Sequence, residues 1–216
     1  MQKPLYIFDI DGTLTDSIAT YIIAITQVLS DIGLTDIDTD YDNYLHHTDR
    51  YALAYNYERN FGKPITEALC NQVDELLEKE LHKHPPAIEI KGAQKTLLAL
   101  QKNDIPFAYG TGAFPRATAV KMNQAKLPLI KEVLATSMQS ITREGFVKQA
   151  IVKAKKYYKE KDFQHIIAVG DGLWDLKAAQ NVGIDFIGVG LKNKEALLEA
   201  GCRVWIEDLI DFPIIQ

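Results

Sequence analysis

The stretch IFDIDGTLTDS, residues 7–17, decides the architecture expected of this chain of 216 residues. It closes a short β-rich run, PLYIFDI (4–10), with two aspartates, Asp9 and Asp11, that are separated by one residue. Gly12 then allows the backbone to turn where a Cβ atom would clash. In an open parallel sheet, ligands bind outside the carboxyl ends of the strands. The stretch therefore predicts a buried first strand that presents a pair of carboxylates at such an edge.

Short apolar runs alternate with segments of helical periodicity after about residue 90. The expected strands are residues 105–110, 133–137, 165–170, 185–190 and 203–207. The expected helices are residues 91–103, 114–127, 146–158, 173–183 and 192–201. Strands and helices that alternate in this way build a parallel sheet with helices on both faces. We therefore expect an α/β fold with a Rossmann-like parallel core.

Residues 17–88 have a different pattern and contain no convincing buried strand. Three segments have the apolar spacing of helices, at residues 17–34, 49–62 and 65–84. The paired prolines of KHPPAIEIKG (83–92) would stop the last of these helices. The simplest interpretation is an α-helical cap domain at 16–88, inserted into an α/β core domain at 1–15 and 89–216.

The composition limits the classes of protein to which the chain can belong. Hydrophobic residues make up 47% and charged residues 25%, which fits a folded domain rather than a disordered chain. No run of about 18 uncharged apolar residues occurs, so we expect no membrane partner. A net charge of −5 argues against nonspecific nucleic-acid binding. The two cysteines and the absence of a signal-peptide pattern favour a cytoplasmic protein. The sequence leaves the oligomeric state open between monomer and homodimer.

A second acidic cluster follows the strand expected at 165–170, in AVGDGLWD (168–175). Asp175 comes four residues after Asp171, so one turn of the following helix brings the two side chains toward each other. With Asp9 and Asp11 they would place four carboxylates at one edge of the sheet, which would be costly without a cation. Mg²⁺ prefers oxygen ligands of this kind. The sequence therefore predicts a Mg²⁺ site formed by these four aspartates.

Two further elements have the chemistry of an anion site. Thr111 and Gly112 follow the strand at 105–110, in YGTGAF (109–114), where a hydroxyl and backbone amides can hold an oxyanion. A cation is also needed to balance a phosphate group. Arg143 and Lys148 both lie near the start of the helix expected at 146–158.

In this order, the elements IFDIDGT, Thr111, a basic residue and GDGLWD resemble the haloacid dehalogenase superfamily of phosphohydrolases, in particular its phosphoglycolate phosphatase-like branch with a small helical cap. The resemblance implies a phosphatase that acts on a small phosphate monoester, with Asp9 as the nucleophile that forms an aspartyl-phosphate. It implies Asp11 as the general acid and base, which also offers a backbone carbonyl to Mg²⁺, and Thr111 as a ligand of a phosphoryl oxygen. Asp171 and Asp175 would complete the metal site, directly or through water.

The sequence departs from the family pattern at the basic element, which is usually a Lys followed by Pro. No such pair occurs in this region. The distance along the chain from Asp171 favours Arg143, with Lys148 as the second choice. An arginine would bind phosphate with a planar fork rather than as a point charge.

The acid at position 11 separates branches of the superfamily. Dehalogenases that form an ester with an alkyl carbon do not need this acid, and phosphonate hydrolases and ion-pumping ATPases place a small or hydroxyl residue there. Asp11 therefore favours hydrolysis of a phosphate monoester. A phosphosugar mutase of the same architecture, and a non-catalytic protein that senses a phosphometabolite, remain open alternatives.

Substrate choice is expected to lie in the helical block, because such a cap closes over the site. His47, Thr48 or Arg50 would face the leaving group. The alternative for Thr48 or Asp49 is to cap the helix that follows. Trp174 is expected to pack the helix at 173–183 against the core, with the alternative that it forms a wall of the cleft.

Overall fold

Strand β1 (Leu5–Phe8) lies in the middle of a six-stranded sheet. The computed structural model describes residues 3–214, so residues 1–2 and 215–216 of the expected core lie outside the described residues. The strand order is β5-β4-β1-β6-β7-β8, and every described pairing in this sheet is parallel. The other strands are β4 (Phe107–Gly110), β5 (Leu134–Ala135), β6 (Ile166–Gly170), β7 (Asp185–Val189) and β8 (Val204–Ile206). The expected α/β fold with a parallel core is confirmed.

The strand order reverses at β1, because β4 and β5 extend the sheet on one side and β6, β7 and β8 on the other. Ligands of open α/β sheets bind at such a reversal, outside the carboxyl ends of the strands. Phe8, the last residue of β1, is in register with Tyr109 of β4 and Val169 of β6. The residues that follow these three strands therefore meet at one edge of the sheet.

Both faces of the sheet are covered, which is why β1 is apolar or aromatic throughout. Tyr6 and Phe8 contact the ring of Phe212 on one face, with centroids 5.1 and 5.5 Å apart. Ile7 packs on the other face with Phe146. The helices of this region are α4 (Ala93–Lys102), α5 (Pro115–Gln124), α6 (Arg143–Tyr158), α7 (Leu173–Val182) and α8 (Lys194–Glu199).

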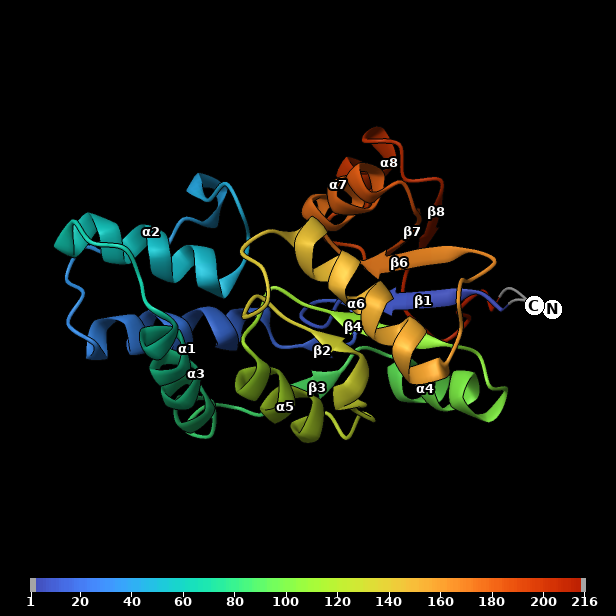
Figure 1. Cartoon of the computed structure of the whole chain (residues 1–216), viewed down its shortest axis with the longest axis horizontal. Coiled ribbons are helices and arrows are strands. Elements are labelled where there is room, and N and C mark those ends of the chain that lie inside the picture. Colours follow the sequence, from blue (N-terminus) through green and yellow to red (C-terminus); the bar gives the residue numbers. More distant parts are fainter. Residues whose placement is uncertain (1–2, 215–216) are drawn as a thin grey trace.

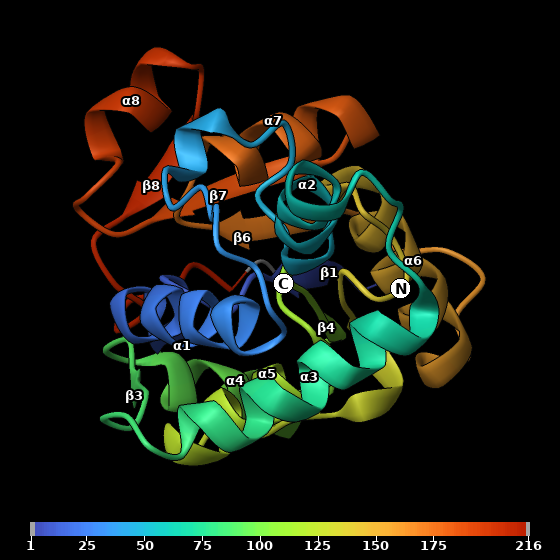
Figure 2. The same cartoon turned by 90° about the vertical axis from the view of Figure 1, so that its left-hand side faces the viewer.

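Three helices, α1 (Ile18–Asp31), α2 (Asp49–Phe61) and α3 (Glu67–Leu81), form a block at the end of the molecule opposite β8 (Figure 1). Figure 2 views the molecule from that end and shows α1 and α3 side by side. A buried apolar cluster joins the block to α5, with Val73 and Leu77 on one side and Phe114 and Ala117 on the other. None of the described helices is long and apolar enough to cross a bilayer.

A short antiparallel ribbon joins the helical block to the core. It consists of β2 (Thr15–Asp16) and β3 (Ile88–Glu89), which pair where the chain enters and leaves the block. This ribbon was not predicted, because each strand has two residues and both residues of β3 are exposed. Such strands show no apolar alternation that a pattern could reveal.

Helix α6 begins at Arg143, three residues before the start expected from the sequence. The reason is its cap: the hydroxyl oxygen of Thr142 accepts a hydrogen bond from the amide of Gly145. The correction matters for the site, since it fixes the backbone of Arg143 at the first position of a helix.

Candidate active site

Three carboxylates converge at the edge of the sheet where β1 and β6 end. Oxygens of Asp9, Asp171 and Asp175 all lie within 4.8 Å of one another. The three residues are 5%, 6% and 8% exposed, so water screens their charges poorly. Asp9 follows β1, Asp171 follows β6, and Asp175 lies in the first turn of α7. The chain folds this way because parallel strands in register end at the same edge.

Burial and mutual repulsion make these groups hold protons more tightly than free carboxylic acids. Burial is the main cause that raises the pKa of Asp9 well above its usual range, and the charge of Asp175 adds to it. The same two causes raise the pKa of Asp171 to about 7. Burial also raises the pKa of Asp175, although Arg143 acts against it. A bound cation would lower the pKa values of these three carboxyl groups, because it favours their ionised forms.

Arg143 supplies the positive charge that the structure itself places in the cluster. One guanidinium nitrogen contacts the carboxylate of Asp175 and lies 3.5 Å from an oxygen of Asp9. A second donates to the backbone carbonyl of His47, at 3.3 Å. Burial disfavours the charged guanidinium, yet the surrounding carboxylates raise the pKa of Arg143 overall. Arg143 therefore stays charged at the centre of the site.

The structure places Lys148, the second predicted cation, outside the site. It is exposed on α6 and is not among the described residues that line the pocket. It follows Arg143 by five residues, which is roughly 140° around a helix from the side that faces the cluster. Of the two basic candidates, only Arg143 reaches the carboxylates.

Thr111 and Gly112 lie at the end of β4, beside the carboxylate cluster, and both line the pocket. Thr111 is 1% exposed, and its amide donates to the carbonyl of Ala135 at 3.0 Å. The carbonyl of Gly112 accepts a hydrogen bond from the amide of Asp49, at 2.9 Å. A Cβ atom on Gly112 would lie 2.6 Å from the carbonyl oxygen of His47. Glycine at this position therefore lets the helical block approach the core closely.

The side chain of Asp11 does not belong to the described carboxylate group, although the sequence analysis grouped it there. Its two oxygens accept hydrogen bonds from the hydroxyl of Ser17, at 2.5 Å, and from the ammonium group of Lys121, at 2.6 Å. Lys121 is 1% exposed and also lies over the ring of Tyr21, 3.6 Å from its centroid. A buried lysine thus fixes the orientation of the Asp11 carboxylate.

The sequence analysis did not identify Lys121. The signal that could have revealed it is its place on the buried face of α5, four residues after Ala117. A lysine on an apolar helix face is rare without a partner.

Three buried side-chain atoms have no hydrogen-bond partner among the described residues. They are Oγ1 of Thr13, Nε of Arg143 and Oδ1 of Asp171. Buried polar atoms are nearly always bonded, and the two that belong to pocket residues, in Arg143 and Asp171, are ones that a bound ion or water would satisfy. Asp171 belongs to the carboxylate group, whose oxygen donors suit a hard divalent cation such as Mg²⁺.

A cavity of about 240 Å³ lies over this edge of the sheet. Both the core and the helical block contribute side chains to it. The core supplies Asp9, Asp11, Thr111, Gly112, Ala113, Arg143, Asp171, Trp174 and Lys192. The helical block supplies Ile18, Tyr21, Ile22, Tyr41, His47, Thr48 and Asp49. Its volume lies below the roughly 300 Å³ at which pockets for drug-sized ligands begin, so it suits a ligand smaller than those.

Two of the three predicted cap residues lie in this pocket. The ring of His47 stacks on Trp174, with centroids 4.5 Å apart and planes 20° apart, so Trp174 forms a wall of the cleft. Thr48 lines the pocket, and it also caps α2 by accepting from the amide of Tyr51. Its hydroxyl donates to the carbonyl of Ile141, at 2.9 Å.

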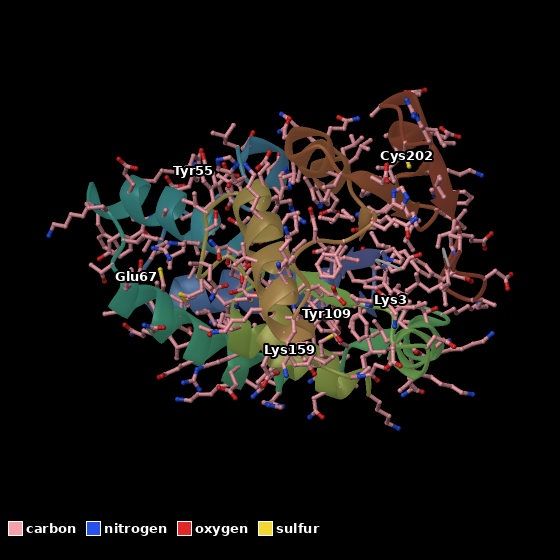
Figure 3. The ribbon with its side chains drawn as sticks, turned by 45° about the vertical axis from the view of Figure 1, so that its right-hand side comes forward. Lys3, Tyr55, Glu67, Tyr109, Lys159 and Cys202 are labelled. Atoms are coloured by element: carbon pink, nitrogen blue, oxygen red, sulfur yellow. The ribbon has the colours of Figure 1, made fainter. Side chains whose placement is uncertain are left out.

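Arg50, the third predicted cap residue, turns away from the pocket. Its guanidinium contacts the carboxylate of Glu67 and donates to the carbonyl of Met138, at 2.7 Å. Glu67 begins α3 and lies in the helical block, where Figure 3 labels it. The expectation that Arg50 faces a leaving group is therefore wrong in this structure, because a neighbouring carboxylate takes its charge.

Asp49 lies in the pocket in a role that the sequence analysis did not foresee. One of its oxygens, Oδ2, accepts both from the hydroxyl of Tyr21 and from the amide of Phe114, the latter at 2.7 Å. Burial is the main cause that raises its pKa to about 7. The cap of α2 is Thr48, so Asp49 is free to tie the helical block to the first residues of α5.

Comparison with known proteins places these motifs in context. Residues 6–189 match the family described as haloacid dehalogenase-like hydrolases. A phosphoglycolate phosphatase of Agrobacterium fabrum is 27% identical over 200 residues, which cover 87% of this chain and 80% of that protein. Among solved structures, CbbY from Rhodobacter sphaeroides in complex with phosphate superposes with a TM-score of 0.73 at 15% identity, over 98% of this chain and 96% of that one. A putative β-phosphoglucomutase from Bacteroides vulgatus gives 0.68 at 18% identity, over 98% and 86%. At such identities the structural likeness concerns the fold.

Proposed function

The chain belongs to the haloacid dehalogenase-like hydrolases and acts on phosphoric monoesters, and on that premise we propose that it is a Mg²⁺-dependent phosphatase that works through an aspartyl-phosphate. The observation that carries this proposal is the convergence of Asp9, Asp171 and Asp175 within 4.8 Å, beside the guanidinium of Arg143. The substrate is a small phosphate monoester, in keeping with a cavity of about 240 Å³.

Asp9 is the nucleophile. Its carboxylate attacks phosphorus, and the oxygen of the leaving alcohol departs on the opposite side. The backbone holds this residue firmly, since the amide of Asp9 donates to the carbonyl of Val169 at 2.9 Å. The attack requires the ionised carboxylate, whose formation burial and the neighbouring acids oppose. Arg143 favours the ionised form and can bind the phosphoryl oxygens with its fork.

Asp9, Asp171 and Asp175 would hold the divalent cation with their side chains, and Asp11 with its backbone carbonyl. The unpartnered Oδ1 of Asp171 and the set of oxygen donors fit a hard cation. When bound, Mg²⁺ would keep the carboxylates ionised and neutralise charge on the transferred phosphoryl group.

Asp11 is the general acid and base. It gives a proton to the oxygen of the leaving group and later takes one from the water that cleaves the aspartyl-phosphate. Ser17 and Lys121 hold its carboxylate at the margin of the pocket, away from the three metal-binding side chains. The two roles of the paired aspartates are thus separated in space. Thr111 and the amide of Gly112 bind the phosphoryl oxygens from the side of β4.

The helical block at 16–88 is the cap that excludes water from the site. Its loop at 46–49 contacts the core through the carbonyl of His47, which accepts from Arg143, and the amide of Asp49, which donates to Gly112. The ribbon of β2 and β3 marks where a hinge would lie. A closed cap strengthens electrostatic interactions around the phosphoryl group, because it removes water.

Phosphate release from p-nitrophenyl phosphate tests the proposal. We expect turnover with Mg²⁺, loss of turnover with EDTA, and no turnover for Asp9→Asn. The control is Asp16→Asn, which changes an exposed carboxylate near the site in sequence and should keep full activity. A quenched reaction with a ³²P-labelled ester should label the wild-type chain and not Asp9→Asn.

Two results would contradict the proposal. One is retention of activity by Asp9→Asn. The other is transfer of the phosphoryl group to a second hydroxyl of the substrate without release of free phosphate.

A further inference from the structure

Much of the pocket lining outside the carboxylate cluster is apolar or aromatic. Outside the carboxylate cluster, the helical block and Trp174 supply the large apolar and aromatic side chains of the lining. Ile18 and Ile22 of α1 form one wall, and the stacked rings of His47 and Trp174 form another. Surfaces of this kind bind the apolar face of a ring more readily than a hydrated anion.

The cations of the helical block that are nearest in sequence to the pocket residues are engaged elsewhere. Arg50 contacts Glu67 and the carbonyl of Met138, and Arg59 forms ion pairs with Asp36 and another aspartate of the same loop. Among the described residues that line the pocket, the helical block contributes no lysine or arginine. A second anionic group on the substrate would therefore find no counter-charge on that side.

The helical block instead contributes a carboxylate. Asp49 lines the pocket, and the hydrogen bonds that its side chain accepts from Tyr21 and from the amide of Phe114 both go to Oδ2. In the described part of the chain, no side-chain hydrogen bond occupies Oδ1 of Asp49 or the hydroxyl of the neighbouring Tyr41. Asp49 can thus accept a hydrogen bond from a hydroxyl of the substrate, and its ionised form would repel a carboxylate.

Lys192 is the cation that could favour an anionic leaving group instead. It lines the pocket but belongs to the core, and it is exposed. Its neighbour Asn193 donates to the backbone carbonyl of Asp171, at 3.0 Å, so Lys192 lies beside the metal-binding residues. Its charge therefore lies close to the groups that would bind the phosphoryl group.

We propose that the leaving group of the natural substrate is a neutral alcohol with a ring or other apolar face, that its hydroxyl bonds to Asp49, and that the site discriminates against leaving groups that carry a carboxylate. This inference rests on the proposed phosphatase function and adds the substrate class to it. The proposed preference would differ from that of the relative named phosphoglycolate phosphatase. The leaving group of phosphoglycolate carries a carboxylate.

Two matched pairs of esters test the inference. The first pair is 2-hydroxyethyl phosphate and 2-phosphoglycolate, which differ in a neutral alcohol against a carboxylate. The second is 4-(hydroxymethyl)benzyl phosphate and 4-carboxybenzyl phosphate. In each pair we expect the neutral ester to have the higher kcat/KM by about tenfold or more, which corresponds to about 1.4 kcal/mol at the transition state. The benzyl ester of the neutral kind should exceed the hydroxyethyl ester.

Substitutions on α1 provide a matched control for charge. Ile22→Lys places a cation on the pocket wall, and Ile23→Lys places the same cation one residue away, on a side chain that is 58% exposed and lies outside the pocket. We expect Ile22→Lys to raise kcat/KM for the carboxylated esters relative to the neutral ones by about tenfold. Ile23→Lys should leave the ratio unchanged. Asp49→Asn should also shift the ratio toward the carboxylated esters.

The possible outcomes separate the two proposals. If no ester, p-nitrophenyl phosphate included, releases phosphate with Mg²⁺, the phosphatase function itself is wrong. If turnover occurs and the carboxylated ester of either pair is equal or preferred, the function stands and the inference about the leaving group is overturned. Selective loss of phosphoglycolate hydrolysis in Lys192→Met would overturn it as well, because it would assign Lys192 to the leaving group. Equal loss for both members of a pair would support it.

Discussion

Replacement of Asp49 by Asn should make the stability of this chain markedly less dependent on pH. Asp49 is 5% exposed, and burial raises its pKa from 3.8 to about 7. The charge of Lys121 and the hydrogen bonds from Tyr21 and Phe114 act in the opposite direction without cancelling the effect. Asn has the same shape, and its amide oxygen can accept the two hydrogen bonds that Oδ2 of Asp49 accepts. The substitution therefore removes the ionisation and keeps the contacts.

The sign and size of the effect follow from the pKa shift. Because the folded state holds the proton of Asp49 more tightly than the unfolded state, this group stabilises the fold fully below about pH 4. The stabilisation is lost as the pH rises from 3.8 to about 7, since the unfolded chain ionises first. A shift of about three units, at about 1.4 kcal/mol each, corresponds to a loss on the order of 4 kcal/mol over the whole window. Between about pH 5 and about pH 8 the loss would be about 2–3 kcal/mol.

Urea unfolding in the presence of EDTA measures this difference. The free energy of unfolding of Asp49→Asn, minus that of the wild type, should increase by about 2–3 kcal/mol from about pH 5 to about pH 8. The subtraction removes the contribution of the other buried acids, which both proteins share. Asp16→Asn, at an exposed position, should show no such increase. Parallel pH profiles for Asp49→Asn and the wild type would refute the reasoning.

Three further substitutions test other parts of the site. Lys121→Met removes the buried partner of Asp11. We expect phosphate-release assays to show a fall in kcat of about a hundredfold or more. We expect urea unfolding to show a destabilisation of about 1–3 kcal/mol. Gly112→Ala forces a Cβ atom against the carbonyl of His47, so kcat/KM should fall at least about tenfold. An unchanged kcat/KM would mean that the helical block does not need to approach Gly112 this closely. Arg143→Lys keeps the charge but loses the fork, and kcat/KM should fall about a hundredfold, with full activity contradicting bidentate binding.

The sequence was sufficient to predict the fold and the position of three of the four acids, Asp9, Asp171 and Asp175. Parallel strands in register end at one edge of the sheet, so Asp9 and Asp171 follow from the order of apolar runs alone. The spacing of four residues also places Asp175 correctly, since it needs only one turn of α7. Gly12 shows how strongly a local motif can be fixed: its φ is +85°, and a Cβ atom there would lie 2.4 Å from an oxygen of Asp171. The positions of Asp9, Asp171 and Asp175 and the turn at Gly12 depend on local backbone geometry, which a short sequence motif is enough to determine.

The features that escaped prediction depend on contacts between segments distant in the chain. The sequence favoured Arg143 over Lys148 only by its distance along the chain from Asp171, and the helix start at the Thr142 cap is what separates the two in space. Arg50 was expected in the pocket, but its guanidinium forms an ion pair with Glu67, seventeen residues later. Lys121 lies 110 residues from the carboxylate that it binds. No local pattern records such pairings, because each requires the packed structure.

The same groups that would hold the phosphoryl group also hold the cap against the core. One guanidinium nitrogen of Arg143 contacts Asp9 and Asp175, and another donates to the carbonyl of His47. Gly112 lines the pocket, and its carbonyl accepts a hydrogen bond from the amide of Asp49. Binding of phosphate at these positions and closure of the helical block are therefore linked through shared atoms. The helical block supplies much of the remaining pocket lining, so we expect the charge of that lining, rather than that of the core, to decide which ester is hydrolysed.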